Sequence, residues 1–470
     1  MEPIALTTAE LAATTEGRLL SGPPDRRIER ISIDSRSVSD GDLFIAIRGE
    51  RFDGHEFVAA ALAAGAAGAV VTKAPAAPEA GHGRPAPVLL QVSDTTRALQ
   101  DIAREVRRRS GAKVVAITGS AGKTTTKELT AEFLSAKYSV FRNKGNLNNH
   151  IGLPLSLLEL RTRPEVAVVE LGMNHPGEIR TLVGVAEPDV RVWTNVGDAH
   201  LGFFVSADAI ADAKGEILEG ARRTDLLVAN ADDPRVMAHV PRFAGRTITF
   251  GVSGRANVRA TSIQHRGLDG VAATVTTPGG QVHLSTSLLG LGNLSNVLAA
   301  AAVASELGIP LDAIAERTAS MRPAAHRGAL LRLPGGVTLI DDSYNSSPAA
   351  LKQSLATVAA ATGSARKTAV LGEMLELGEH ATRLHRECGR AAADAGLDVL
   401  ITVGGDPAKQ LADAARAAGL PAANVLHVGT SEEAAEVALL RIRPGDLVLV
   451  KGSRGIRTDV VVERLKVEFA

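Results

Sequence analysis

Short apolar runs alternate along the chain with longer segments of helical periodicity. In the first hundred residues, the runs predict strands at 30–36, 42–47 and 68–71 and helices at 57–64 and 95–109. Strand-length runs that alternate with helical segments are typical of α/β units. We therefore expect a small α/β domain over residues 1–111, with an exposed Pro/Ala/Gly-rich loop at 73–87.

The middle of the chain carries the strongest strand signals. Apolar runs predict strands at 114–117, 165–171, 190–196 and 226–233, glycine-separated runs indicate antiparallel strands at 247–250, 271–276 and 282–288, and a helix is expected at 294–307. We expect a mostly parallel sheet with an antiparallel extension, in a domain over residues 112–321. Because ligands of open α/β sheets lie beyond the carboxyl ends of the strands, chemistry is expected there.

The last third repeats a strand–helix rhythm. Predicted strands lie at 337–341, 368–371, 399–403 and 447–450, and predicted helices at 349–361, 381–395, 408–418 and 431–440. Such alternation predicts a second doubly wound, Rossmann-like domain over residues 322–470. The fold class is therefore α/β with three domains.

Charge and cysteine content narrow the function classes. The 52 Lys and Arg residues balance 52 Asp and Glu residues, so nucleic-acid binding gets no support. The N-terminal residues lack the pattern of a secretory signal, and no apolar run reaches the ~18 residues that span a bilayer. Cys388 is the only cysteine, which excludes an intrachain disulfide and predicts a small buried residue. We expect a soluble, cytoplasmic protein without an integral membrane segment.

A glycine-rich stretch between a predicted strand and a predicted helix is the clearest chemical signal. It reads Gly119-Ser120-Ala121-Gly122-Lys123-Thr124-Thr125. Glycines let backbone N–H groups turn toward a phosphate, the helix N-terminus adds partial positive charge, and the lysine reaches the outer phosphates. The spacing is shorter than the usual P-loop spacing. We interpret it as a P-loop variant, against the alternative of a glycine turn before a surface lysine.

Other polar residues have both a functional and a structural interpretation. Glu170 ends a predicted strand, which suits a Mg²⁺ ligand or an ordinary solvated carboxylate. A lone His200 is more often structural than a ligand, and Lys214 alone resembles a surface lysine on an amphipathic helix. The run Arg107-Arg108-Arg109 is expected to be a solvated helix C-terminus, where arginine suits the helix dipole.

The order of the motifs resembles one family. They are Thr118–Thr125, Gly145-Asn146-Leu147-Asn148-Asn149, Glu170-Leu171-Gly172-Met173, Asn195–Leu201, Ala213–Ile217, Leu291–Asn296, Asp341-Asp342-Ser343-Tyr344-Asn345, Leu371–Gly378 and Lys451–Arg454. Over nearly the whole chain they resemble the Mur ligases, the ATP-dependent amide-forming enzymes of peptidoglycan precursor synthesis. The Asn-Leu-Asn-Asn, Asp-Asp-Ser-Tyr-Asn and Met-Leu-Glu-Leu-Gly forms are most similar to the branch that adds D-alanyl-D-alanine to UDP-N-acetylmuramoyl-tripeptide.

The resemblance implies a role for each matching residue. ATP would be bound by Gly119, Ser120, Ala121, Gly122, Lys123, Thr124, Thr125, Asn293, Asn296, Arg327 and Asp342. One Mg²⁺ would lie between Thr124 and Glu170, a second near His200, and Lys214 would be carbamylated and serve as a ligand. The catalytic set would thus be Lys123, Glu170, His200 and Lys214. Asn293 and Asn296 have helix capping as their structural alternative.

The resemblance implies substrate contacts in all three predicted domains. They would be made by Ser35, Arg36, Asn146, Asn148, Asn149, Tyr344 and Asn345. The implied reaction passes through an acyl phosphate on the tripeptide, and the enzyme is expected to be monomeric. A Mur-type ligase for another amine, and a P-loop NTPase switch or motor, stay open as alternatives. The sequence leaves open whether lysine or diaminopimelate is the third residue of the tripeptide.

Overall fold

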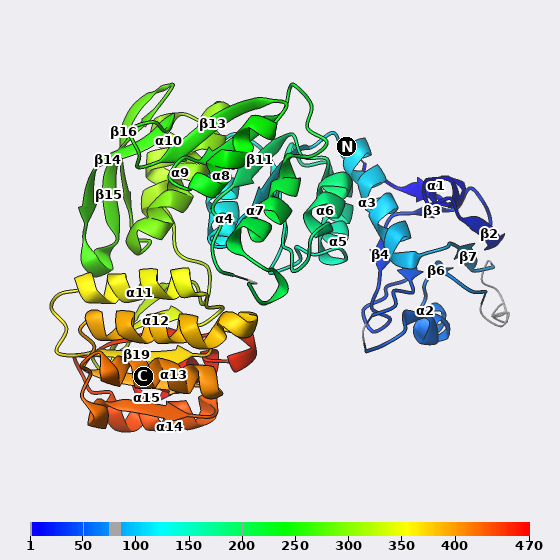
Figure 1. Ribbon diagram of the computed structural model, residues 1–470. Coiled ribbons are helices and arrows are strands. Elements are labelled where there is room, and N and C mark those ends of the chain that lie inside the picture. The colour runs from blue at the N-terminus through cyan, green and yellow to red at the C-terminus, as the bar shows by residue number, and fades with distance from the viewer. Residues whose placement is uncertain (1, 50, 75–85, 200) are drawn as a thin grey trace. The chain divides into compact units, whose positions relative to one another are not determined.

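The computed structural model describes residues 2–49, 51–74, 86–199 and 201–470 (Figure 1). The predicted loop at 73–87 therefore lies largely outside the described residues. Contacts divide the chain into two compact units. The first unit comprises Met1–Ala116, Lys137–Arg191 and Glu219–Asp225, and the second comprises Ile117–Ala136, Val192–Leu218 and Leu226–Ala470. The domain boundaries at 111 and 321 stay a prediction.

The N-terminal part of the first unit is a small α/β domain. Its five-stranded sheet has the order β2 (Arg18–Ser21), β7 (Val88–Gln91), β6 (Gly68–Val71), β5 (Leu43–Ile45) and β4 (Ile31–Ser32). Strands β4 to β7 pair in parallel, whereas β2 pairs antiparallel with β7. Outside this sheet, β1 (Leu6–Thr7) pairs antiparallel with β3 (Arg27–Ile28). Its helices are α1 (Thr8–Thr14), α2 (Val58–Ala63) and α3 (Thr95–Ser110). The α/β class is confirmed, although the strand predicted at 30–36 is only two residues long.

Helix α3 begins and ends where local chemistry dictates. The Asp94 carboxylate accepts the backbone N–H groups of Thr96 and Arg97 at 2.7 and 3.1 Å, which satisfies two donors of the first turn. At the other end, Gly111 takes a left-handed conformation with φ of 70°, which glycine adopts without steric cost. These caps agree with the predicted helix at 95–109.

The prediction of a solvated arginine run at the end of α3 is wrong for Arg107. Its guanidinium is buried and donates to the backbone oxygens of Ala186 and Glu187 at 2.8 and 2.7 Å. It also forms an ion pair with Asp189 at 2.9 Å. The arginine therefore joins α3 to the segment after α6 (Glu178–Ala186), because those carbonyls need donors at a helix end.

A nine-stranded sheet forms the centre of the chain. Its order is β16 (Gly280–Thr286), β15 (Val271–Thr277), β14 (Val258–His265), β13 (Arg246–Gly251), β12 (Leu226–Asn230), β11 (Val190–Trp193), β8 (Lys113–Thr118), β10 (Val166–Glu170) and β9 (Val140–Arg142). The helices are α4 (Lys123–Leu134), α5 (Gly152–Leu158), α6, α7 (Ala207–Gly215), α8 (Pro234–His239), α9 (Gly290–Glu306) and α10 (Leu311–Ser320). The antiparallel extension is confirmed for β14, β15 and β16.

Strand β13 corrects one prediction, because it pairs in parallel with both β12 and β14. Strand β14 was not expected at all. Only Val258 and Ala260 of that strand are buried, and its other side chains are more exposed, so the segment lacks the apolar run of a fully buried strand. The antiparallel arrangement therefore starts one strand later than predicted.

The C-terminal part of the second unit is a six-stranded Rossmann-like domain. The strand order is β17 (Ala329–Arg332), β18 (Thr338–Asp342), β22 (Leu447–Lys451), β19 (Lys367–Gly372), β20 (Val399–Val403) and β21 (Val425–Val428). Strands β18 to β22 pair in parallel, and β17 pairs antiparallel with β18. The helices are α11 (Pro348–Ala360), α12 (Ala381–Asp394), α13 (Asp406–Ala417), α14 (Ser431–Arg441) and α15 (Asp459–Glu468). The predicted doubly wound domain is confirmed.

Two predictions from composition can be compared with the structure. Cys388 is fully buried, and burial raises the pKa of its thiol to about 12, as expected for a small packing residue. Across residues 2–49, 51–74, 86–199 and 201–470, no helix is long and apolar enough to cross a bilayer.

Candidate nucleotide-binding site

The predicted P-loop lies between β8 and α4 in the second unit, where two of its glycines are sterically required. A Cβ at Gly119 would lie 1.9 Å from the Thr194 hydroxyl oxygen. Gly122 has a φ of 81°, and a Cβ there would lie 2.1 Å from Oδ1 of Asn296. Both spaces are too small for any side chain, so the loop conformation depends on glycine at these two positions. The Lys123 ammonium donates to the Gly119 carbonyl oxygen at 2.8 Å.

Asn195, two residues after the end of β11, holds the P-loop in place. Its backbone oxygen accepts the N–H of Ser120 at 3.0 Å, and its Oδ1 accepts the N–H of Ala121 at 2.8 Å. Its Nδ2 donates to the Ala121 oxygen at 3.1 Å. Next along the chain, the N–H of Gly197 donates to the Ser120 hydroxyl at 2.8 Å. Asn195 was not among the predicted site residues, although its position after a buried strand was the available signal.

Helix α9 supports the P-loop from another direction. Oδ1 of Asn296 accepts the Thr126 hydroxyl at 3.2 Å, and its Nδ2 donates to Oδ1 of Asn293 at 3.2 Å. Asn293 in turn donates to the Leu289 oxygen at 2.9 Å. The helix begins at Gly290, so Asn293 lies inside its first turn and the capping alternative for it is wrong. The contacts of both asparagines with ATP stay a prediction.

Arg327 joins the Rossmann-like domain to the P-loop. Its Nη2 donates to the Thr124 hydroxyl at 3.3 Å. Its guanidinium carbon lies 3.9 Å from the centre of the Tyr344 ring, and that of Arg454 lies 5.5 Å from the same ring. Stacking on an aromatic face orients a guanidinium while leaving its N–H groups available for other partners. The structure therefore brings together the predicted residues Arg327, Thr124 and Tyr344.

Asp342 and Asn345 are organised by a lysine that the sequence interpretation did not single out. The buried Lys451 ammonium donates to Oδ2 of Asp342 at 2.7 Å and to the Asn345 backbone oxygen at 3.0 Å. The Ser354 hydroxyl donates to the same Asp342 oxygen at 2.9 Å. The Asp342 carboxylate is thus held in a fixed direction. Its contact with ATP stays a prediction.

Glu170 and the asparagine loop lie together in the first unit. The buried Glu170 carboxylate accepts Nδ2 of Asn148 at 2.7 Å. Its backbone N–H donates to Oδ1 of the buried Asn143, which the prediction had missed. Asn149 accepts the N–H of Gly152 at 2.8 Å and so stabilises the start of α5. The Asn146 backbone oxygen accepts the N–H of Asn148 at 2.8 Å.

The predicted metal ligands are distributed over the chain. Glu170 belongs to the first unit, Thr124 and Lys214 belong to the second, and His200 lies outside the described residues. Within the part of the chain that the structure describes, no three His, Cys, Asp or Glu side chains gather closely enough to hold a metal ion. Taken one at a time, the Thr124 hydroxyl and the Glu170 carboxylate are each oxygen donors of the kind that Mg²⁺ takes, together with water and phosphate oxygens.

Lys214 is buried, whereas the structural alternative was a lysine on the protein surface. It lies in α7 with 1% exposure, and the neighbouring Gly215 would place a Cβ 2.9 Å from the His239 ring. A side chain buried to this degree has a specific environment, so the alternative of a solvated helix face is wrong.

Two turns of the N-terminal domain, at residues 34–36 and 53–55, have well-defined local structures. The Arg36 guanidinium donates to both Asp34 carboxylate oxygens, at 2.9 and 2.7 Å, and holds the Asp34 pKa at about 2. The Asp53 carboxylate accepts the His55 N–H at 3.0 Å, while Nε2 of His55 accepts the Thr72 N–H at 2.9 Å. Arg36 is exposed, and Ser35 is partly buried beside it. Their substrate contacts stay predictions.

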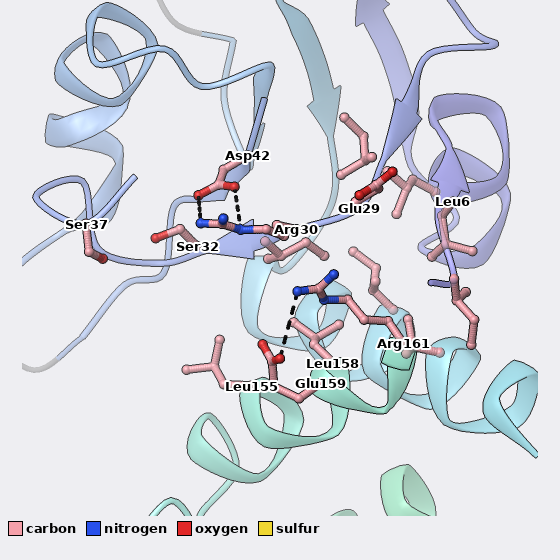
Figure 2. A pocket seen from close by; sticks show the side chains of 16 residues that line it. Leu6, Glu29, Arg30, Ser32, Ser37, Asp42, Leu155, Leu158, Glu159 and Arg161 are labelled. Atoms are coloured by element: carbon pink, nitrogen blue, oxygen red, sulfur yellow. Dashed lines mark hydrogen bonds and ion pairs between the residues drawn. The ribbon is translucent and has the colours of Figure 1, made fainter. Parts of the chain in front are cut away.

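A pocket of about 340 Å³ opens elsewhere in the first unit (Figure 2). Its lining is mixed, with nine aliphatic and seven polar or charged residues. Arg30 forms an ion pair with Asp42 at 3.1 Å, and Arg161 forms a longer one with Glu159 at 3.9 Å. No predicted site residue lines it, so it does not belong to the predicted nucleotide or substrate sites.

Comparisons with known proteins agree with this geometry. Family models match residues 27–107 (Mur ligase family, catalytic domain), 117–304 (Mur ligase middle domain) and 326–454 (Mur ligase, glutamate ligase domain). A UDP-N-acetylmuramoyl-tripeptide–D-alanyl-D-alanine ligase of Synechocystis is 37% identical over 94% of this chain and 93% of its own length.

Two similar crystal structures cover nearly the whole chain. MurF from Acinetobacter baumannii is 31% identical with a TM-score of 0.89, over 99% of this chain and 100% of its own. MurF ligase from Thermotoga maritima in complex with ADP is 31% identical with a TM-score of 0.83, over 94% and 97%. The P-loop geometry, the three-domain α/β fold and these similarities agree, and the chain belongs to the Mur ligase family.

Proposed function

We propose that this chain is an ATP-dependent ligase that joins D-alanyl-D-alanine to UDP-N-acetylmuramoyl-tripeptide in peptidoglycan precursor synthesis. The observation that carries the proposal is the P-loop of a Mur ligase fold whose Thr124 hydroxyl is reached by Arg327 of the Rossmann-like domain. Full-length relatives with this named activity support the substrate assignment, and the ADP complex of one relative supports the nucleotide.

The reaction must first activate an unreactive carboxylate. The terminal carboxylate of the tripeptide attacks the γ-phosphorus of ATP, which forms an acyl phosphate and releases ADP. The amine of D-alanyl-D-alanine then attacks the acyl carbon, the amide forms, and phosphate leaves with the original carboxylate oxygen. The proton lost by the amine passes to solvent or to a base.

The cationic side chains at the P-loop suit the first step. Charge on the transferring phosphoryl group is stabilised by fixed positive groups, which supply most of the catalysis in phosphoryl transfer. Lys123 and Arg327 supply two such groups, and the Tyr344 ring fixes the direction of Arg327. We assign Asp342, Asn293 and Asn296 to the nucleoside of ATP.

Thr124 and Glu170 would hold Mg²⁺, which would neutralise phosphate charge when bound. We propose that Lys214 is carbamylated: its ammonium first loses one proton, and the neutral amine then forms an N–C bond with CO₂ and releases a second proton. A cation thereby becomes an anion. An anion at this buried position suits a metal-rich site better than an ammonium does. The second Mg²⁺, the role of His200, the monomeric state and the cytoplasmic location stay predictions.

We assign the substrate contacts to residues from three separate parts of the chain. We assign Ser35 and Arg36 to the nucleotide sugar and the loop of Asn146, Asn148 and Asn149 to the peptide part of that substrate. Tyr344 and Asn345 are assigned to the side of the dipeptide. The Asn148–Glu170 hydrogen bond supports this assignment, because it couples the asparagine loop to a proposed metal ligand.

An isotope experiment tests the function and its intermediate together. The tripeptide nucleotide is labelled with ¹⁸O in its terminal carboxylate and incubated with ATP and D-alanyl-D-alanine. We expect an amide product by mass spectrometry and one ¹⁸O atom in the released phosphate. Phosphate without label contradicts the acyl phosphate, and equal phosphate release without the dipeptide contradicts the ligase. A panel of other amines, with lysine- and diaminopimelate-containing nucleotides, separates the proposal from a Mur-type ligase of different specificity.

A further inference from the structure

A turn of the C-terminal domain contacts a turn of the central domain within the second unit. The N–H of Gly202 donates to the backbone oxygen of Glu376 at 2.7 Å. Gly202 lies in a short 3₁₀ helix at Leu201–Phe203, and Gly378 begins another at Gly378–His380. The two domains therefore meet backbone against backbone at this point.

Neither glycine leaves room for a side chain. A Cβ at Gly202 would lie 2.7 Å from the Gly378 nitrogen and 2.9 Å from the Glu376 oxygen. A Cβ at Gly378 would lie 2.8 Å from the Gly202 Cα. These are contacts with backbone atoms, which cannot rotate away as the end of a flexible side chain can. Any larger residue at either position must therefore separate the two turns.

The turn of the C-terminal domain is built to keep its shape. Glu376 has a φ of 64° and Gly378 a φ of 54°, both in the left-handed region, and a non-glycine residue stays there only when its surroundings impose it. Two hydrogen bonds hold the residues just before Glu376. The backbone N–H of Met374 donates to Nε2 of His385, and that of Leu375 donates to the Ser453 hydroxyl, both at 2.9 Å.

His385 is the buried anchor of this turn. It is fully buried, and its Nδ1 donates to the Ala381 oxygen at 2.7 Å. That bond places the ring proton on Nδ1, so Nε2 can only accept the N–H of Met374. Because the ring has one tautomer and both of its nitrogens are used, the turn presents the Glu376 oxygen in a fixed direction.

In the central domain, the turn that contains Gly202 follows directly after the segment that binds the P-loop. Asn195 and Gly197 bind Ser120 and Ala121 through the hydrogen bonds described above. Gly202 lies five residues beyond Gly197 in the chain. The C-terminal domain thus touches the same segment that fixes the loop and also reaches Thr124 through Arg327.

We infer that Gly202 and Gly378 are positioning residues, whose lack of side chains lets the C-terminal domain sit on the central domain with Arg327 at the P-loop. The inference rests on the proposed ligase function. An alanine at either position separates the turns and withdraws Arg327 from Thr124 of the P-loop. The chemical step and use of the dipeptide should then suffer, whereas binding of the nucleotide sugar should not.

The variants Gly202→Ala and Gly378→Ala test this, with Gly363→Ala as the matched control. Gly363 also has a positive φ, 83°, but a Cβ there would meet no atom within 4 Å, so it reports the conformational cost alone. We expect kcat/KM for D-alanyl-D-alanine to fall about tenfold or more in the two test variants, with KM for the tripeptide nucleotide changed less than about twofold. The control should stay near wild type.

A distance measurement separates positioning from a general loss of stability. Spin labels on cysteines introduced at the exposed Arg255 and Glu436 report the separation of the two domains. We expect a longer or broader distance distribution in both test variants, with Gly363→Ala like wild type. An unchanged distribution together with unchanged kinetics overturns the inference, and so does an equal effect in the control.

Hydrogen exchange of the wild-type protein keeps the inference testable if both variants fail to fold. The amide of Gly202 should exchange slowly in the full-length enzyme, because it donates to Glu376. Rapid exchange at Gly202 overturns the inference even when the enzyme is active. Absence of ligase activity in the wild-type protein instead contradicts the proposed function, so the two failures are distinguishable.

Discussion

Oδ1 of Asn195 accepts the backbone N–H of Ala121 at 2.8 Å, and Nδ2 of the same side chain donates to the Ala121 oxygen at 3.1 Å. One carboxamide therefore satisfies both backbone groups of a P-loop residue that lies 74 positions earlier in the chain. A loop fixed in this way keeps its shape before ATP arrives, so less ordering is needed on binding.

Replacing Asn195 with alanine should weaken ATP binding, because both hydrogen bonds to Ala121 are lost. A net loss of about 1–2 kcal/mol, from one or two bonds, corresponds to a Kd increase of roughly 5- to 30-fold. Titration calorimetry with a non-hydrolysable ATP analogue measures it. Asn257→Ala is the matched control. Asn257 accepts the backbone N–H of Thr249, and both residues lie far from the P-loop in the sequence. Equal affinity in Asn195→Ala and wild type would refute the bracing role.

Gly122 offers a prediction with an internal check. Gly122→Ala combines a positive φ with a Cβ 2.1 Å from Oδ1 of Asn296, so we expect ATP affinity to drop by about tenfold or more. In the background of Asn296→Ala the clash is removed while the backbone cost remains, so the same change should have a smaller effect. Gly177→Ala is the control, because Gly177 also precedes a helix with a positive φ, but a Cβ there meets nothing within 4 Å. Additive effects of the two substitutions would show that the clash is not what matters.

Lys214 should require CO₂ for its function. We expect Lys214→Met to lose activity by about 100-fold or more while keeping its fold, because methionine matches the buried stem of the lysine. Lys214→Arg should be equally inactive, since arginine keeps the charge but does not form the carbamate. Carbon-13 NMR of protein equilibrated with ¹³C-bicarbonate should show a carbamate signal that both variants lack. An active enzyme without that signal would refute the carbamate.

The sequence predicts the architecture better than it predicts the contacts of the site. Apolar runs locate β12 and β20 because buried parallel strands carry a continuous apolar signal. They do not reveal the direction of β13, because the pairing of a strand depends on neighbours elsewhere in the chain. Family motifs identified Lys123 and Glu170 as candidates. The position of Asn195 after a buried strand marks it as a candidate. Its partner in the P-loop could not be predicted, because that partner is a backbone group of a distant segment.

His385 illustrates the same limit. It lies in α12 and accepts the backbone N–H of Met374, and nothing in the sequence indicates this hydrogen bond. Its environment makes a prediction about pH. Burial lowers the pKa of His385 below its ordinary value of 6.5, although the Ala381 oxygen and the Glu373 charge act in the opposite direction. The imidazole therefore stays neutral in the folded protein, whereas in the unfolded chain it takes up a proton near pH 6.5.

Stability should consequently depend on pH through this one side chain. Above pH 6.5 the stabilisation by neutral His385 is fully present, and it is lost as the pH falls below 6.5 toward the folded-state pKa. We expect the free energy of unfolding of the wild-type protein to fall more steeply over that window than that of His385→Gln. Denaturant unfolding at a series of pH values measures the difference. His283→Gln, which removes an exposed histidine, should follow the wild-type slope, and parallel slopes for His385→Gln and wild type would contradict the assignment.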